Sequence, residues 1–304
     1  MNFFSVLLQA IVQGLTEFLP VSSSGHLSLV QHFTKFDLEG AQAFAIFLHL
    51  GTLIAVLIAF RELIWELIRE FGSMVADLVK RKFSWKLEDM SANRRMVIML
   101  FVATFCAVVI FLPLLGIFGI HDANGELVKN LADLSKYTSE DNDIVVEGVA
   151  LLTTGALLLY ATLIQKDKKR SVTQKISGKH AIVMGLGQSL AAGFPGLSRS
   201  GTTTTFGMIA GLEKNTALQF SFIMSIPAIL AANLLEFVKM DSAAWSEFQF
   251  MPALIGIIVA GIVGILAIKA LKWVVANDKL NYFGYYCLGL GAVVIIIGII
   301  EHAS

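Results

Sequence analysis

Two short polar segments interrupt long apolar stretches of this sequence, and both contain side chains that could bind a phosphate group. The first spans residues 13–26 and the second spans residues 195–203. In each, a proline leads into a serine-rich turn that ends in Ser-Gly. Ionisable side chains within apolar segments are costly and are therefore functional candidates. The two segments hold three of them: Glu17, His26 and Arg199.

The two polar segments combine one carboxylate with several anion-binding groups. Glu17 lies four residues after Gln13, so both side chains leave the same face of a helix. Arg199 can bind phosphate oxygens bidentately, and the N-terminal amides of a helix that follows each turn favour an anion. Hydroxyls and glycines suited to hold that anion occur in both turns: Ser22, Ser24, Gly25, Ser198, Ser200, Gly201, Thr202 and Thr203. This combination is typical of a phosphoryl-transfer site.

Each feature also has a plainer structural interpretation. Ser-Gly turns satisfy the ends of helices, and a single arginine can extend its charge to the membrane surface. A single histidine within an apolar segment, such as His49, can be a hydrogen-bonded packing residue. The occurrence of all these groups together, in two similar breaks, favours a functional site.

The composition indicates what positions these groups. Of the 304 residues, 56% are apolar and 15% are charged, and the mean hydropathy is +0.74. Too little polar side chain is left to cover a soluble protein, so the sequence predicts an integral membrane protein. The net charge of zero gives no argument for nucleic acid as a partner. Cys106 and Cys287 lie within apolar runs and indicate neither a disulfide framework nor a zinc site.

The apolar runs predict an all-α polytopic membrane protein, a single membrane domain over residues 1–304. Residues 3–34 and 181–213 are apolar but broken by the two turns. Unwound backbone at membrane depth is tolerated only where protein or a water-filled cavity covers it, so both predict re-entrant helix pairs. Six further runs approach the 20 or so residues that a spanning helix needs: 41–60, 96–118, 148–165, 216–238, 251–272 and 282–300.

The charges of the connections orient the chain. Residues 61–95 hold eight Lys or Arg against six acids, and residues 166–180 hold six against one. Residues 119–147 show the reverse, with two lysines and seven acids. The positive-inside rule therefore places 61–95, 166–180 and the turn at 269–281 in the cytoplasm and both termini outside. An amphipathic helix on the membrane surface is expected over 62–82.

The two broken segments resemble each other and predict an inverted repeat. Gln13 and Gln188 each precede the proline of their segment by seven residues. The likeness continues into the next span, where residues 44–51 align with residues 220–227. Three spans follow each broken segment, so the second copy, residues 181–304, must lie upside down relative to the first, residues 1–165. Inverted repeats with paired broken helices place a site near the midplane.

The two segments resemble the signatures of the undecaprenyl-pyrophosphate phosphatase family, known for bacitracin resistance. The matching residues are Gln13-Gly-Leu-Thr-Glu17-Phe-Leu-Pro-Val-Ser-Ser-Ser-Gly-His26 and Pro195-Gly-Leu-Ser-Arg-Ser-Gly-Thr-Thr203. The resemblance covers essentially the whole chain. It implies a membrane hydrolase that converts the lipid pyrophosphate C55-PP to C55-P and phosphate, and so recycles the carrier for peptidoglycan. It also implies a location in the bacterial cytoplasmic membrane and a site open to the outer face. Whether the protein forms a homodimer stays open.

Carried over by position, the resemblance implies roles for the ionisable residues. Arg199 would stabilise the charge of the transferred phosphoryl group, and Glu17 would hold a divalent cation, Mg²⁺ or Ca²⁺, or orient the nucleophile. His26 is the first candidate for the nucleophile or general acid–base, Ser23 is its competitor, and direct attack by water stays open. The family has Glu or Gln at the position of Gln13, and the amide here weakens a two-carboxylate metal site.

Two other classes of membrane protein share features with this sequence. Acid-phosphatase-like membrane enzymes also use Ser-Gly-His and Ser-Arg pieces, but they require an Arg-Pro pair and a histidine six residues after their arginine. This chain has Thr205 at that position and contains no Arg-Pro. A transporter or flippase of lipid phosphate is the second alternative, because inverted repeats with broken helices are transporter architecture. An enzyme should release phosphate in detergent, whereas a carrier acts only across a sealed membrane.

Overall fold

The computed structural model describes residues 3–34, 41–84, 86, 89–117, 144–167, 171–194, 196–239 and 250–303. Helices make up nearly all of this described part, and the only β pairing in it is an isolated bridge between Thr173 and Leu212. Pro195 and most of the acidic connection 119–147, both used in the sequence predictions, lie outside the described residues.

All six predicted spans are helices. They are α3 (Ala41–Ala59), α5 (Ala92–Ile117), α7 (Ile144–Lys166), α10 (Lys214–Lys239), α12 (Phe250–Ala276) and α13 (Asn281–Ala303). Within the described residues, all but α3 are individually long and apolar enough to cross a membrane. The described part of α3 meets that test only together with the helix that follows it. The prediction of an all-α polytopic membrane protein is confirmed.

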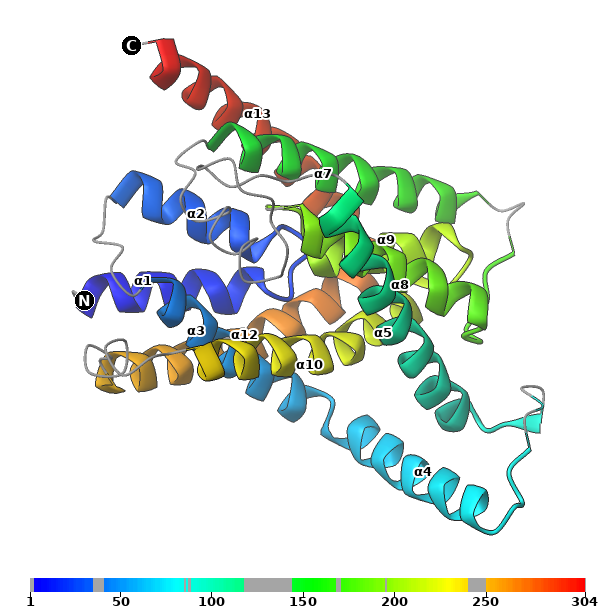
Figure 1. Cartoon of the computed structure of the whole chain (residues 1–304). Coiled ribbons are helices and arrows are strands. Elements are labelled where there is room, and N and C mark those ends of the chain that lie inside the picture. Colours follow the sequence, from blue (N-terminus) through cyan, green and yellow to red (C-terminus); the bar gives the residue numbers. More distant parts are fainter. Residues whose placement is uncertain are drawn as a thin grey trace.

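The amphipathic segment expected over 62–82 forms α4 (Arg61–Val79), which bends by 82° away from α3. Figure 1 shows α4 projecting from the rest of the bundle. Arg94 of α5 fixes the helix: its Nε donates to Glu70 at 2.6 Å, and its Nη2 lies 2.9 Å from Asp77. Large apolar side chains, such as Trp65, are exposed on α4. Such a helix suits the interface between membrane and water.

Both interrupted segments form helix pairs, as predicted. The first pair is α1 (Phe3–Thr16) with α2 (Ser23–Thr34), and the second is α8 (Gly178–Gly193) with α9 (Arg199–Ile209). Figure 1 shows α1 and α2 running antiparallel, so the first segment returns to the end of the molecule from which it entered. Both chain termini lie at that end. At the other end, Lys214 pairs with Asp278 and Thr173 bridges to Leu212.

Each broken segment packs against a helix of the other half of the chain. Helix α1 lies against α12, and α8 lies against α5. At the first contact, a Cβ on Gly14 would stand 2.7 Å from the carbonyl oxygen of Ala260. At the second, Ser189 Oγ donates to the carbonyl oxygen of Ala107 at 2.8 Å. This exchange of partners is what an inverted repeat requires, and the repeat itself stays a prediction.

Glycines allow α7 and α13 to pack with their backbones in close approach. A Cβ on Gly155 would lie 2.7 Å from the carbonyl oxygen of Gly284, and one on Gly291 would lie 2.7 Å from that of Gly148. Each helix therefore places two glycines, seven residues apart, against the two of its antiparallel partner. Small residues at such contacts are the usual basis of helix association in membranes, where lipid removes the hydrophobic driving force.

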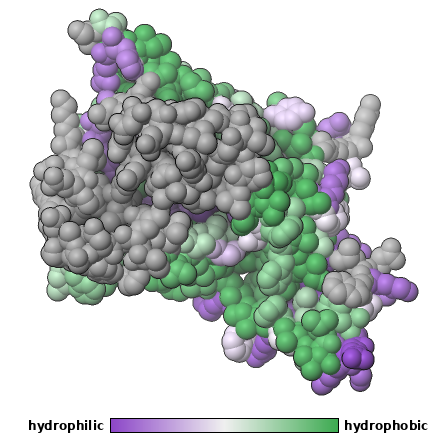
Figure 2. Space-filling view, viewed as in Figure 1, coloured by the Kyte–Doolittle hydropathy of each residue, from purple (hydrophilic) through white to green (hydrophobic). Residues whose placement is uncertain are grey.

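The outer surface of the bundle is apolar. Figure 2 shows hydrophobic residues over much of the visible described surface, with hydrophilic residues gathered mainly towards the ends. On α5, Phe101, Phe105 and Val108 are exposed, as are Leu230 and Leu234 on α10. A soluble protein rarely exposes such patches, so these faces are suited to contact lipid.

Candidate active site

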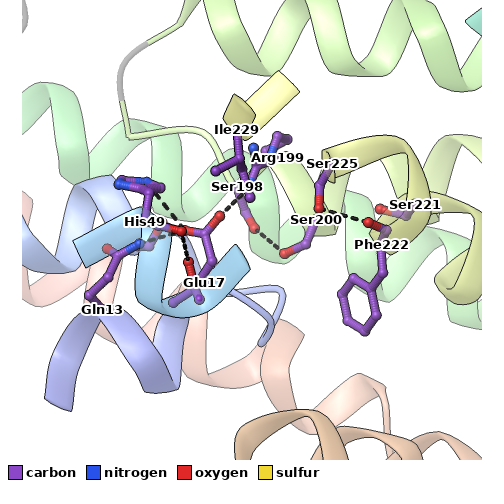
Figure 3. A network of polar contacts seen from close by, with 12 residues as sticks. Gln13, Glu17, His49, Ser198, Arg199, Ser200, Ser221, Phe222, Ser225 and Ile229 are labelled. Carbon is purple, nitrogen blue, oxygen red and sulfur yellow. Dashed lines mark hydrogen bonds and ion pairs between the residues drawn. The ribbon is translucent and has the colours of Figure 1, made fainter. Parts of the chain in front are cut away.

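Glu17 is the centre of a polar network inside the bundle (Figure 3). It lies in the break after α1, and its side chain is only 2% exposed. The Nε2 of Gln13 donates to Glu17 Oε2 at 2.9 Å, which agrees with the prediction that both side chains leave the same helix face. Ser23, the first residue of α2, donates its hydroxyl to the same oxygen at 2.7 Å. The two helices of the first pair are thus joined through one carboxylate.

Two cationic or potentially cationic groups from other parts of the chain reach the same carboxylate. Arg199, the first residue of α9, is ion-paired through its Nη2 with Glu17 Oε1. His49 of α3 places Nε2 at 3.5 Å from Oε2. Burying a carboxylate is expensive unless it is paired and hydrogen-bonded, and here the second half of the chain supplies the charge. The pair therefore brings both broken segments to one point.

The serine-rich turns are built on the same hydrogen bond. Ser22 Oγ accepts from the backbone N–H of Gly25 at 3.1 Å, and Ser198 Oγ accepts from that of Gly201 at 3.1 Å. Each serine is the N-cap of the helix that follows, and it satisfies one of the N–H groups that a helix start leaves unpaired. A Cβ on either glycine would lie within 3.1 Å of the capping oxygen. This explains the shared Ser-x-x-Gly pattern of the two turns.

The equivalence extends to the neighbours of the capping serines. Two positions after each cap lies a second hydroxyl, Ser24 in the first turn and Ser200 in the second, within 3.5 Å of the capping oxygen. The position between them is Ser23 in the first turn and Arg199 in the second. Both of these residues bond to Glu17. The corresponding positions of the two turns therefore converge on one side chain.

A cavity of about 480 Å³ opens beside this network. Its polar lining comes from both broken segments, from α3 and from one residue of α5: Thr16, Glu17, Ser23, Ser24, His49, Thr104, Gln188, Ser189, Ser198, Arg199 and Ser200. Its remaining wall is made of small and apolar residues of α5, α8 and α10, among them Ala107, Ala191, Ala228 and Ala231. Val108 also lines the cavity and is 52% exposed, so this wall reaches the outer surface of the bundle.

A difference between the two halves explains where the cavity lies. In the first half, Gly51 allows α3 to approach the backbone of α12 at Ile257. The aligned position in the second half is Pro227, which lies inside α10 and lines the cavity. Helix α10 makes far less contact with α5 than α3 makes with α12. The gap between α10 and α5 is the apolar part of the cavity.

The structure divides the predicted phosphate-binding and catalytic residues into two groups. One group lines the cavity: Glu17, Ser23, Ser24, Ser198, Arg199 and Ser200. The others do not: Gln13, Ser22, Gly25, His26, Gly201, Thr202 and Thr203. Among these, Ser22, Gly25 and Gly201 form the helix caps, and Thr203 bonds to the carbonyl of Arg199 and the hydroxyl of Ser221.

His26 makes its hydrogen bonds to groups outside the Glu17 network. Its Nδ1 donates to the carbonyl of Ser22 at 2.7 Å, and the Tyr286 hydroxyl lies 2.8 Å from its Nε2. The two rings are also stacked, with centroids 5.7 Å apart. Both ring nitrogens are therefore occupied by contacts that tie α2 to α13. His49, for which the sequence left a packing role open, is the histidine that reaches the carboxylate.

The residues around Glu17 offer few ligands for a divalent cation. The described residues contain no group of three His, Cys, Asp or Glu side chains that could hold one. One carboxylate is present, and Gln13 Oε1 is buried beside it without a hydrogen-bond partner among the described residues. Mg²⁺ commonly uses one or two carboxylates and takes its other ligands from substrate phosphates and water. The residues fit a cation that is completed by a phosphate ligand.

Comparisons with known proteins show the family of this chain. The chain is 33% identical over 300 residues to an undecaprenyl-diphosphatase of Alkaliphilus metalliredigens, covering 99% of this chain and all of the relative. It is 36% identical over 303 residues to an undecaprenyl-diphosphatase of Methanobrevibacter smithii, covering 99% of each chain. The family model described as bacitracin resistance protein BacA matches residues 6–293. The chain therefore belongs to the bacitracin resistance protein BacA family.

Proposed function

We propose that this protein hydrolyses undecaprenyl pyrophosphate to undecaprenyl phosphate and inorganic phosphate, and so recycles the lipid carrier of peptidoglycan synthesis. The observation that carries the proposal is the buried Glu17–Arg199 pair at the polar end of a cavity with an apolar wall. The names of the relatives support the same activity. Removal of pyrophosphate from the pool of carrier lipid would confer bacitracin resistance.

The shape and lining of the cavity suit an amphiphilic pyrophosphate. The phosphates would lie at the polar end, where α2 and α9 both begin, because helix N-termini attract anions. The isoprenoid chain would lie along the alanine-rich wall between α5 and α10, where Val108 reaches the outer surface. A water-soluble phosphate ester would leave that wall uncovered.

Arg199 is the group that binds the phosphoryl oxygens. A guanidinium offers two parallel N–H donors to phosphate, and it stabilises the charge that develops as the phosphoryl group transfers. Its side chain is 27% exposed, whereas that of Glu17 is 2% exposed, so part of the guanidinium is accessible. Ser198 and Ser200 line the cavity on either side of Arg199 and provide hydroxyls to the same anion.

Ser23 is the nucleophile and Glu17 is its general base. Ser23 is the cavity hydroxyl that donates to the Glu17 carboxylate, whereas both nitrogens of His26 are occupied elsewhere. Ser23 Oγ attacks the terminal phosphorus, its proton passes to Glu17, and the bond to the bridging oxygen breaks to release undecaprenyl phosphate. Water then hydrolyses the phosphoserine and releases inorganic phosphate.

Glu17 and Gln13 Oε1 are the groups that would hold a divalent cation, Mg²⁺ or Ca²⁺. When bound, it supplies positive charge against the pyrophosphate. Its removal by EDTA should lower phosphate release, and added Mg²⁺ should restore it.

The cytoplasmic membrane is the proposed location, with both termini and the mouth of the site on the outer face. The grouping of both termini at one end of the bundle supports this orientation (Figure 1), as do the cationic connections 61–95, 166–180 and 269–281. Cysteine labelling at positions near either terminus, in intact cells, tests the orientation. A homodimer stays a prediction.

The experiment that tests the activity is phosphate release from undecaprenyl pyrophosphate by purified protein in detergent. The wild type should release phosphate, and Arg199→Ala should lose at least about 100-fold, the scale set by removing one transition-state donor. No release by folded wild type would contradict the enzyme and favour the transporter alternative, because a carrier has no activity without a sealed membrane.

A further inference from the structure

Gln188 is a buried amide in the wall of the cavity, in the second broken segment. It lies on α8, lines the cavity and is 7% exposed. Its Oε1 has no hydrogen-bond partner among the residues that the structure describes. Polar side chains that are buried to this degree are nearly always hydrogen-bonded, so each exception requires an explanation. A ligand that enters the cavity is one explanation that can be tested.

The first half of the chain shows what such an amide does when its partner is present. Gln13 on α1 donates its Nε2 to the carboxylate of Glu17, four residues later. Gln13 and Gln188 each precede the proline of their segment by seven residues. Four residues after Gln188 the chain has Ala192, where the first segment has Glu17. The second amide therefore lacks the carboxylate that the first one binds.

The space that this alanine leaves belongs to the cavity. Ala192 lines the same cavity as Gln188, together with the Arg199 guanidinium and the hydroxyl of Ser200 near the start of α9. An anion here would meet an amide from α8 and a guanidinium from α9. The only anion of the substrate is its pyrophosphate, and an amide N–H is a suitable donor to a phosphoryl oxygen.

We propose that Gln188 donates its amide Nε2 to a phosphoryl oxygen of the pyrophosphate. The phosphate would thus be the partner of Gln188, as the Glu17 carboxylate is the partner of Gln13. This inference rests on the proposed phosphatase function. It makes Gln188 a substrate-binding residue whose Nε2 donates to the phosphate.

The test is Gln188→Leu, which keeps the approximate volume and removes the amide. Two quantities are measured on purified protein in detergent: the melting temperature without ligand, and the inhibition constant of inorganic phosphate against phosphate release. Because Gln188 Oε1 has no hydrogen-bond partner among the described residues, removal of the amide should leave the melting temperature unchanged or raise it. The loss of a hydrogen bond to a charged phosphate should weaken inhibition by about 10-fold or more.

Gln9 on α1 provides the matched control. It is 3% exposed, donates its Nε2 to Ser5 at 2.9 Å and accepts from Gln31 at 3.4 Å. Gln9→Leu should therefore show the opposite result, a lower melting temperature with unchanged phosphate inhibition. The opposite signs of the two variants separate a ligand-binding amide from a structural one.

A second pair of variants fills the space directly. Ala192→Glu places a carboxylate four residues after Gln188 and reproduces the Gln13–Glu17 arrangement, whereas Ala192→Gln adds similar volume without charge. The glutamate should weaken phosphate inhibition at least 10-fold more than the glutamine, because it occupies and repels the phosphate. Equal effects of the two variants would contradict the proposed position of the phosphate.

The outcomes also separate this inference from the proposed function. Any fall in the melting temperature of Gln188→Leu would overturn the inference, since the amide would then have a partner within the protein. Unchanged phosphate inhibition in Gln188→Leu would overturn it as well, even where Arg199→Ala abolishes phosphate release. Failure of the wild type to release phosphate is the separate result that contradicts the function itself.

Discussion

Arg199 is ion-paired with Glu17, a residue 182 positions earlier in the chain, and this pair joins the two broken segments. Glu17 lies in the break after α1, and Arg199 is the first residue of α9, directly after the second break. Before substrate binds, the guanidinium and the carboxylate satisfy each other. In the proposed mechanism, a phosphate that enters the cavity competes with Glu17 for Arg199 and frees the carboxylate to act on Ser23.

Ser23 is expected to be essential, whereas its neighbour Ser24 is not. Both serines line the cavity, but Ser23 is the one that donates to Glu17. Ser23→Ala should lower phosphate release by at least about 100-fold, and Ser24→Ala by about 10-fold or less. Acid quenching of the wild type during turnover, followed by mass spectrometry, should find phosphate on Ser23. Normal turnover by Ser23→Ala would instead indicate direct attack by water.

His26 and Tyr286 are expected to act as one structural unit. Because the imidazole bonds to the tyrosine hydroxyl across 260 positions of sequence, Tyr286→Phe should reproduce most of the effect of His26→Gln. Each should cost about 1 kcal/mol of stability, the typical value of one hydrogen bond. Melting temperature and turnover of both variants test this. If His26→Gln abolished turnover while Tyr286→Phe left it intact, the histidine would have to be catalytic.

The packing of α7 on α13 should be sensitive to a single methyl group. Gly155→Ala places a Cβ 2.7 Å from the carbonyl oxygen of Gly284, and relief of such overlap costs about 1–3 kcal/mol. Gly289→Ala, on α13, meets nothing within 4 Å and serves as the control. The first variant should melt at a lower temperature in detergent, and the second should match the wild type. Equal melting temperatures would show that the two backbones are not in contact.

The positions of the helices and of both breaks could be predicted from the sequence, because their causes are local. Apolar runs of about 20 residues fix the spans, and serine N-caps next to glycine fix the starts of α2 and α9. The spacing of Gln13 and Glu17 predicted that both side chains leave one helix face, and the structure adds a hydrogen bond between them.

The partners of His26 and His49 could not be predicted from the sequence, because they come from other helices. His26 follows the Ser-Gly turn directly, yet Tyr286 of α13 holds its ring, and nothing near position 26 indicates that partner. His49 lies in the middle of a span, and its approach to Glu17 requires α3 to pack beside α1. The general rule that ionisable groups within spans are functional candidates was the signal that could have included His49.

The cavity also could not be predicted from composition. It exists because α10 stands away from α5, whereas α3 and α12 are in close contact. The alignment of Gly51 with Pro227 is visible in the sequence, but its consequence depends on how closely two backbones approach.

The central claim is that the two turns form one active site around Glu17 and Arg199. A double-mutant cycle with Glu17→Gln, Arg199→Gln and the double variant tests it most directly, with phosphate release measured at excess enzyme. Each single variant should lose at least about 100-fold, and the double variant should lose little more than either, because residues that act as a unit are not additive. If the two losses multiplied in the double variant, the residues would act independently and the claim would be contradicted.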